Sequence, residues 1–413
     1  MAQTDTSGRP LFEPDRHAPL IDTAWDEGAA RAAIIAIAED ARRAFSQSEL
    51  WPIHPDDIEG DDRSPETSLY VGAAGVIWAL DHLRREGAIP SSPSFAEYLP
   101  AIQERNRRSF DSEAWHRLLG SDWQTRSLLL GESGILLTRW KTGDASALVP
   151  LAQMVADNAA DPSWELMWGA PGTMLAALAV FRATGIGQWA ELCRASADTL
   201  IKAFDYDAGF DGHIWTQRLY QRTEQYLGAV HGFAGNAYAL IAGLKLLDRQ
   251  QWGVVCSQVE DTLRRTAIHG DEGVNWAASL GEQAAGRRLL VQHCHGAPGM
   301  ITALSKLPAP IDDLLRDAGR LTWVAGPLAK GFGLCHGTAG NGFAFLKLYE
   351  RTGDALWLER ARRFAMHALH QSQARAAETG QGRYSLWTGD LGLACYLWEC
   401  SQATARFPTI DVF

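Results

Sequence analysis

The chain has 413 residues, a formal net charge of −11 at pH 7 and an isoelectric point near 5.6, a balance that excludes binding to nucleic acid through phosphate contacts. No stretch has the length and apolarity of a membrane span, and the first residues lack the basic region and apolar core of a secretion signal, so we expect a cytoplasmic location. Six cysteines in so long a chain do not indicate a disulfide framework; in a reducing compartment, Cys beside His indicates metal binding or catalysis.

The first 65 residues are predicted to precede the main fold. Residues up to about Asp22 are polar and contain proline, and are expected to be ordered only by docking. Ile21–Ser48 has the spacing of an amphipathic helix, and Trp51–Pro65, with its acids and prolines, is expected to be a loop. We therefore expect residues 1–65 to be an N-terminal segment and residues 66–413 to form the repeat region, in one domain overall.

From residue 66 onward the chain repeats a Gly-x-x-Gly quartet that opens an apolar run. The seven quartets begin at Gly72, Gly131, Gly169, Gly232, Gly296, Gly337 and Gly389. The intervals between these first glycines are 59, 38, 63, 64, 41 and 52 residues. Periods of this size are typical of architectures in which one supersecondary unit recurs.

The segments between the quartets predict paired helices. The runs that follow the quartets are rich in Ala, Leu and Phe without alternation, as in buried helices. More polar segments with helical spacing separate them, for example Trp189–Ala203, Val254–Ala267 and Ala355–Gln373. An open superhelix would need polar capping repeats, whereas the first and last quartets are as regular as the others. We therefore predict an all-α fold: a closed α/α toroid of seven helical hairpins, with an inner and an outer ring and all seven inner helix starts at one rim.

Three residues in a shared register predict a metal site at that rim. Counting backwards from the first glycine of each quartet, Cys294 and Cys335 both stand at position minus two, and His336 stands at minus one. Singly, such residues are more often buried hydrophobes or helix caps. Together, two thiolates and an imidazole from consecutive repeats suit Zn²⁺. Three protein ligands would leave a fourth position open, which is typical of a catalytic zinc.

Two further histidines share the minus-one position. His231 has no neighbouring cysteine, so it is a candidate general acid or base near the metal; the alternative is a hydrogen-bonded rim histidine. His295 follows Cys294, and we expect it to contact a metal ligand or to face the substrate, where it is a second candidate for the catalytic proton donor.

At these residues the chain resembles the lanthionine synthetase C-like (LanC-like) family. The matching segments are His293-Cys-His-Gly-Ala-Pro-Gly299, Gly331-Phe-Gly-Leu-Cys-His-Gly-Thr-Ala-Gly-Asn341, Tyr226-Leu-Gly-Ala-Val-His-Gly232 and Ser385-Leu-Trp-Thr-Gly389. The resemblance implies the seven-hairpin toroid, zinc bound by Cys294, Cys335 and His336, and catalysis by His231. One branch of the family closes thioether rings in lanthipeptides; the stand-alone branch binds glutathione and adds it to dehydroamino acids in proteins.

Three details make the chain more similar to the stand-alone branch. His295 stands where the cyclases typically have tyrosine. The cyclases also have an aspartate shortly before the second quartet, whereas here the nearest carboxylates are Asp122 and Glu132. Lys330 matches a basic position of the stand-alone branch and is expected to pair with a glutathione carboxylate, the alternative being an exposed lysine.

The resulting functional prediction is zinc-dependent addition of a thiol, with glutathione favoured, to dehydroalanine or dehydrobutyrine in a peptide or protein. The alternatives are a lanthipeptide cyclase and a non-catalytic protein that binds zinc or glutathione. Because the chain has no phosphorylating motif such as a P-loop, a separate kinase or dehydratase is expected to act upstream.

Overall fold

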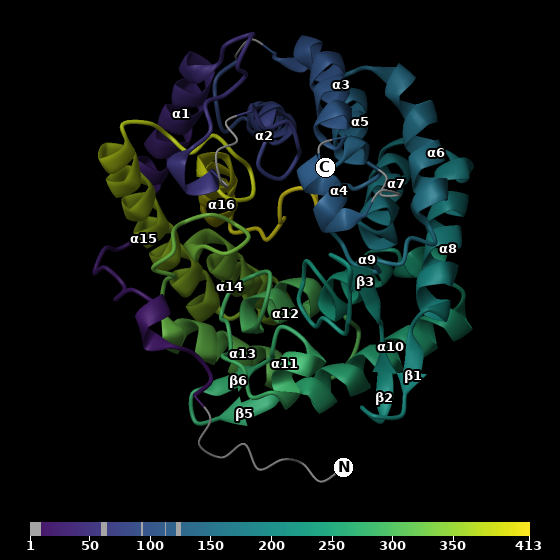
Figure 1. Cartoon of the computed structure of the whole chain (residues 1–413). Helices are drawn as coiled ribbons and strands as arrows, with labels where there is room; N and C mark the ends of the chain where they lie inside the picture. Colours follow the sequence, from purple (N-terminus) through teal and green to yellow (C-terminus); the bar gives the residue numbers. More distant parts are fainter. Residues whose placement is uncertain (1–9, 59–63, 92–93, 112, 121–124) are drawn as a thin grey trace.

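A computed structural model of the protein describes residues 10–58, 64–91, 94–111, 113–120 and 125–413, and its helices form two concentric rings (Figure 1). In the described residues the inner ring consists of α2 (Ala73–Arg85), α5 (Glu132–Lys141), α7 (Ala170–Thr184), α9 (Phe233–Ala242), α12 (Ala297–Leu304), α14 (Thr338–Thr352) and α16 (Asp390–Gln402). The outer ring consists of α1 (Glu27–Ala44), α3 (Leu99–Ser109), α6 (Leu148–Asn158), α8 (Gly187–Lys202), α10 (Arg249–Thr266), α13 (Asp312–Ala325) and α15 (Ala355–Thr379).

The inner ring is closed. Each inner helix contacts the next in chain order, and α16 also contacts α2, so that the last repeat packs against the first. The inner helices are buried on nearly all sides; every residue of α12, for example, is buried. The outer helices bury one face, as the four buried residues of α1 illustrate. The predicted all-α toroid is therefore confirmed.

The quartets start the inner helices, as predicted. The first glycine of each quartet is the N-cap residue of α2, α5, α7, α9, α12, α14 or α16. The second glycine permits close backbone contact: a Cβ on Gly299 would lie 2.0 Å from the carbonyl oxygen of His293. Gly296 has φ +105°, a conformation that L side chains rarely adopt. Glycine is thus required where the chain turns from the metal-site loop into the helix.

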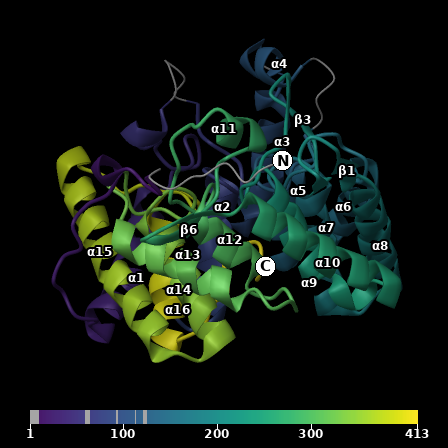
Figure 2. The same cartoon turned by 90° about the horizontal axis from the view of Figure 1, so that it is seen from below.

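The rim and the outer surface also carry short elements that the repeat pattern does not predict. Three antiparallel hairpins pair β1 (Asp205–Asp207) with β2 (Gly212–Ile214), β3 (Gln217–Leu219) with β4 (Arg222–Glu224), and β5 (Ile268–Gly270) with β6 (Gly273–Asn275). The short helices are α4 (Glu113–Leu119) and α11 (Leu280–Ala284). Figure 2 shows α4, α11 and β3 projecting at one end of the ring.

The lead helix is shorter than predicted. Helix α1 begins at Glu27, because the Asp26 side chain caps it by accepting a hydrogen bond from the Ala29 amide, and it ends where Phe45 becomes extended. The described part of the predicted loop contains a 3₁₀ turn, Pro55–Asp57; residues 59–63 lie outside the described residues.

Both ends of the described chain dock onto the ring. The N-terminal residues run along the loop before the sixth quartet, where the Ala18 amide donates to the Pro327 carbonyl at 2.9 Å and the Ala329 amide donates to Arg16 at 3.0 Å. The segment after α16 returns to the middle of the ring, where Asp411 contacts Tyr238 of α9 and Lys347 of α14. In the described residues, no helix is both long and apolar enough to cross a membrane.

Candidate metal centre and proton donor

The residues before the quartets line one cavity. The cavity has a volume of about 1300 Å³. Five minus-one residues contribute to its wall: Val71, Leu130, His231, His336 and Thr388. Residues at the same position of different repeats thus line the same cavity. This is expected where the repeats are related by rotation about the toroid axis.

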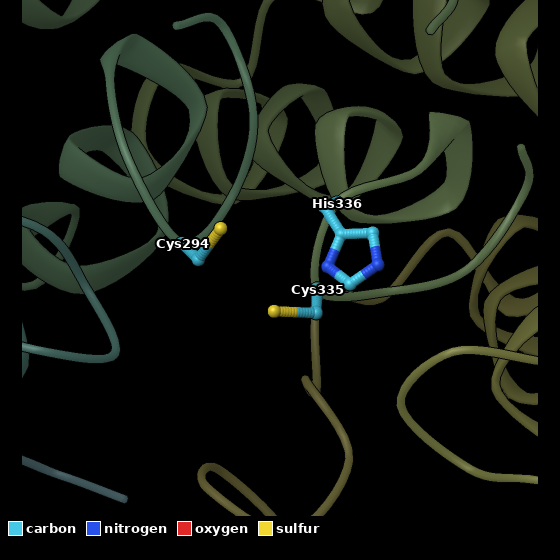
Figure 3. A group of neighbouring side chains, drawn as sticks. All are labelled: Cys294, Cys335 and His336. Atoms are coloured by element: carbon cyan, nitrogen blue, oxygen red, sulfur yellow. The ribbon is translucent and has the colours of Figure 1, made fainter. Parts of the chain in front are cut away.

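The structure brings together the three predicted metal ligands. The ligand atoms of Cys294, Cys335 and His336 lie within 4.8 Å of one another. The Cys294 and Cys335 side chains point into the gap between their loops, and the His336 ring lies beside them (Figure 3). A backbone hydrogen bond of 3.0 Å from the Cys294 amide to the Cys335 carbonyl holds the two loops in place.

The chemistry of these donors fits zinc. Both thiols are buried, with residue exposures of 7% and 4%. They share a hydrogen bond, which lowers the pKa of Cys294 well below its usual value and raises the pKa of Cys335, because one proton serves both sulfurs. Zinc–ligand bonds of about 2.0–2.3 Å are compatible with donor atoms that lie within 4.8 Å of one another. Two thiolates would also neutralise the dication in a buried setting.

Neighbouring side chains fix the two sulfurs. The Gln292 amide nitrogen donates to Cys294 Sγ at 3.0 Å. The Tyr70 hydroxyl hydrogen-bonds Cys335, a contact that counteracts the raised pKa of the thiol. Such partners orient metal ligands and tune their basicity. The sequence interpretation missed both residues, although Tyr70 stands at minus two of the first quartet, the position that cysteine occupies in the fifth and sixth.

His231 lies on the cavity wall with a buried carboxylate behind it. Its Nδ1 lies 2.9 Å from Oε2 of Glu165, whose side chain is 0% exposed. Burial alone would lower the pKa of His231, but the hydrogen bond and the negative charge of Glu165 outweigh it and raise the pKa. Because Glu165 occupies Nδ1, Nε2 is the nitrogen available for proton exchange. The imidazole is thus held in one orientation and favoured in its protonated form.

Glu165 is the functional candidate that the sequence interpretation missed. It stands at minus four of the third quartet, where other repeats have residues such as Ser68, Ser127 and Ser385. Like Ser127, it also caps the local turn, accepting the Met167 and Trp168 amides. The available signal was that Glu165 is the one carboxylate at this register, where the other six repeats have serine, glycine or glutamine.

The carboxylates considered from the sequence do not take this role in the described structure. Glu132 is buried at the start of α5 and is bound by Gln103, Arg107 and Thr125. Asp122 lies outside the described residues. The carboxylate that contacts His231 is instead Glu165, which comes from the third repeat and is brought to the histidine by the fold rather than by sequence proximity.

His295 follows the predicted ligand Cys294 in the chain and contacts His231. Its ring stacks on His231 with a centroid distance of 6.2 Å and an interplanar angle of 26°. Burial lowers the pKa of His295, and its buried Nδ1 has no hydrogen-bond partner among the described residues. A neutral imidazole packed against a protonated one suits a positioning role better than a second acid.

Lys330 is exposed on the loop before the sixth quartet and contributes to the cavity wall. Its positive charge counteracts the raised pKa of Cys335. Arg383 lies on the same wall and forms a two-point ion pair with Asp57, with Nε to Oδ2 at 2.8 Å. Lys330 is therefore placed where it can meet an anionic ligand of the cavity.

Comparison with known proteins agrees with this geometry. A sequence model of the family described as "Lanthionine synthetase C-like protein" matches residues 37–412, so the chain belongs to this family. It is 35% identical over 196 residues, 46% of each chain, to "Glutathione S-transferase LANCL1" of Danio rerio. It is 30% identical over 262 residues, 60% of this chain and 58% of the relative, to "LanC-like protein GCL1" of Arabidopsis thaliana. The matches thus span about half the length of these relatives.

A solved structure titled "Nisin cyclase" has the same fold. The TM-score is 0.59 at 15% sequence identity, over 92% of this chain and 96% of that one.

Proposed function

We propose that the protein adds the thiol of glutathione to dehydroalanine or dehydrobutyrine residues of a peptide or protein, in a zinc-dependent reaction. The observation that carries the proposal is that His336 of the Cys-Cys-His group and the Glu165-paired His231 face the same cavity. A metal site suited to a thiolate and a proton donor are the two functions that thiol addition needs. The name of the zebrafish relative, a glutathione S-transferase, supports glutathione as the thiol.

The atoms balance without a further reactant. The thiol loses its proton, the sulfur bonds to the β-carbon of the acceptor, the carbon–carbon π bond breaks, and one proton reaches the α-carbon. Zn²⁺, when bound by Cys294, Cys335 and His336, would supply positive charge that lowers the thiol pKa from its free value of about 8.5. The product is a thioether.

The remaining roles in the reaction are assigned to residues of this chain. Gln292 and Tyr70 orient the two cysteines. Lys330 would pair with a glutathione carboxylate and turn the thiol toward the ligand group. His231, protonated because of Glu165, would deliver the proton to the α-carbon as charge develops on the acceptor's carbonyl, and His295 would hold the His231 ring by stacking.

A second candidate is ring closure in a dehydrated lanthipeptide. The His231–Glu165 pair favours it, since in the family's cyclases an aspartate before the second quartet is proposed to act with the corresponding histidine. Both candidates require an upstream step that removes water from Ser or Thr overall: a dehydratase, or a kinase followed by elimination of phosphate. A cytoplasmic location remains a prediction.

The proposal is tested by incubating the zinc-loaded chain with glutathione and a dehydroalanine peptide and measuring the peptide mass. We expect a gain of one glutathione, its loss after chelation and its return with added zinc. A zinc-loaded chain that leaves the peptide unmodified would contradict the proposal. Cyclisation of a dehydrated precursor in the presence of glutathione, without an adduct, would favour the second candidate.

A further inference from the structure

The cavity is large for one small ligand. Pockets for single drug-sized ligands usually have volumes of about 300–1,000 Å³, whereas this one has about 1300 Å³. The proposed reaction has two organic reactants, so such a cavity must place both. Its lining differs in chemistry between the α15 side and the α4 and β3 side of the ring, and this difference assigns one side to each reactant.

One side of the cavity is charged. Lys330 comes from the loop before the sixth quartet, Arg375 and Glu378 come from α15, and Arg383 pairs with Asp57. This wall offers paired ionic groups to a ligand with both carboxylates and an amine. It suits glutathione, because its ionic groups can pair with the carboxylates and the amine of that thiol.

The opposite side is apolar and aromatic. Trp115 and Leu118 come from α4, and Tyr220 from the turn between β3 and β4. In Figure 1, α4 and β3 lie across the ring from α15. Leu118 is 44% exposed and lines the cavity, so it presents an apolar side chain to whatever enters.

This apolar wall is continuous with the proton donor. The Tyr220 ring lies 6.1 Å from the His231 ring, centroid to centroid. Tyr220 accepts a hydrogen bond of 3.0 Å from the buried Trp168 indole, which in turn packs edge-on against Trp115 at 5.8 Å. Tyr220 also has φ +54°, a left-handed conformation that is unfavourable for a bulky residue. The hairpin thus holds an aromatic side chain beside His231 in spite of the backbone cost.

We propose that the acceptor is a peptide segment in which an apolar or aromatic residue flanks the dehydroamino acid and packs against Trp115, Leu118 and Tyr220. The inference rests on the proposed function. The proton goes to the α-carbon of the acceptor, so the acceptor must lie at His231, and its neighbouring residue then falls on the adjoining apolar wall. The charged side of the cavity is then available to glutathione, which supplies the thiol.

The test compares three acceptors with glutathione and the zinc-loaded chain: a dehydroalanine peptide with phenylalanine on both sides, the same peptide with aspartate on both sides, and N-acetyl-dehydroalanine amide. Two variants are compared with the unaltered chain, Leu118→Asp and the control Leu356→Asp. Leu356 is the same residue type, is 43% exposed against 44% for Leu118, and lies on α15. Folding of each variant is checked by thermal unfolding.

The unaltered chain should favour the phenylalanine peptide over the aspartate peptide by roughly tenfold or more in kcat/KM, since burial of an aromatic side chain has an effect of that order. Leu118→Asp should remove most of this preference and leave the rate with the small amide nearly unchanged. Leu356→Asp should keep the preference. Equal effects of the two substitutions on the phenylalanine peptide would overturn the inference.

A binding measurement separates this inference from the proposed function. If none of the three acceptors gains glutathione, the proposed function fails, and a labelled phenylalanine peptide with alanine in place of dehydroalanine then tests the surface alone by fluorescence anisotropy. Weaker binding to Leu118→Asp than to Leu356→Asp would support an apolar peptide site. The same affinity for both variants would overturn it.

Discussion

Nδ1 of His231 and Oε2 of Glu165 lie 2.9 Å apart, although the residues are 66 positions apart in the chain. The carboxylate comes from the loop before α7 and the imidazole from the loop before α9, and these inner helices are neighbours in the ring. The Leu166 amide donates to the Val230 carbonyl at 3.0 Å and fixes the two loops in register. Toroid geometry thus places a buried negative charge directly behind the proposed acid.

Replacing Glu165 with glutamine should shift the pH dependence of thiol addition. Protonated His231 is the acid, so activity is present below its pKa and is lost as the pH rises through it. Because the carboxylate raises this pKa, its removal should move the alkaline limb of the rate profile down by about 1–3 pH units. Zinc content, measured by metal analysis, should be unchanged. An alkaline limb that stays in place would contradict the role of Glu165.

Replacing His231 with asparagine should keep the zinc and lower kcat with glutathione by about 10²–10⁴-fold, the usual contribution of a positioned acid. In the double variant with Glu165→Gln, little further loss is expected, because the carboxylate acts through the imidazole. Rate measurements on the four proteins of this cycle check the prediction. Loss of zinc from the single His231 variant would instead identify this histidine as a metal ligand.

Replacing Cys335 with alanine should remove most of the bound zinc, since the variant retains two of three ligands. Cys193→Ala is the matched control, because Cys193 is also a buried free thiol but lies on the outer helix α8. Metal analysis of both purified variants, together with thermal unfolding with and without chelator, measures the effect. Full zinc occupancy in Cys335→Ala would show that the ligand assignment is wrong.

Replacing Lys330 with glutamate should raise KM for glutathione and leave KM for mercaptoethanol nearly unchanged, because only glutathione has carboxylates. An exposed ion pair contributes about 0.2–1 kcal/mol, so the expected increase is about two- to fivefold and should shrink with added salt. Lys245→Glu, at an exposed lysine outside the cavity lining, is the control. Equal effects on the two thiols would remove Lys330 from the glutathione site.

The glycine register predicted the ring and the meeting of Cys294, Cys335 and His336, because identical positions in rotated repeats must meet at one rim. Glu165 was not predicted as a functional residue because its local sequence pattern is that of a turn cap. Its contact with His231 depends on how far one repeat is rotated from the next, which the sequence does not give. The apolar wall could not be predicted from the sequence for a similar reason. Helix α4 and the β3–β4 hairpin are insertions outside the repeat, so no register relates Trp115 or Tyr220 to His231.

The segment after α16, in the middle of the ring, forms a buried ion pair from which we predict an effect on stability. Lys347 is fully buried, and its Nζ lies 2.7 Å from Oδ2 of Asp411, which also accepts a hydrogen bond from Tyr238. Replacing Asp411 with asparagine leaves the buried ammonium with only a longer contact to the exposed Glu350, at 3.9 Å, which should lower the free energy of unfolding by about 3–5 kcal/mol. Denaturant unfolding measures the loss, and the double variant with Lys347→Met should recover part of it because no charge is then left unpaired.

The same pair predicts how stability changes in acid. Burial alone would raise the pKa of Asp411, but the charges of Lys347 and Lys306 outweigh it and lower the pKa below its usual value near 3.8. A carboxyl group whose pKa is lowered by folding stabilises the protein above its unfolded pKa, and this contribution is lost as the pH falls through the folded value. Asp411→Asn should therefore be less stable than the unaltered chain near neutral pH, and the difference should narrow below about pH 4. A difference that is constant down to pH 2 would show that packing of the C-terminal segment, rather than the ionised pair, accounts for the effect.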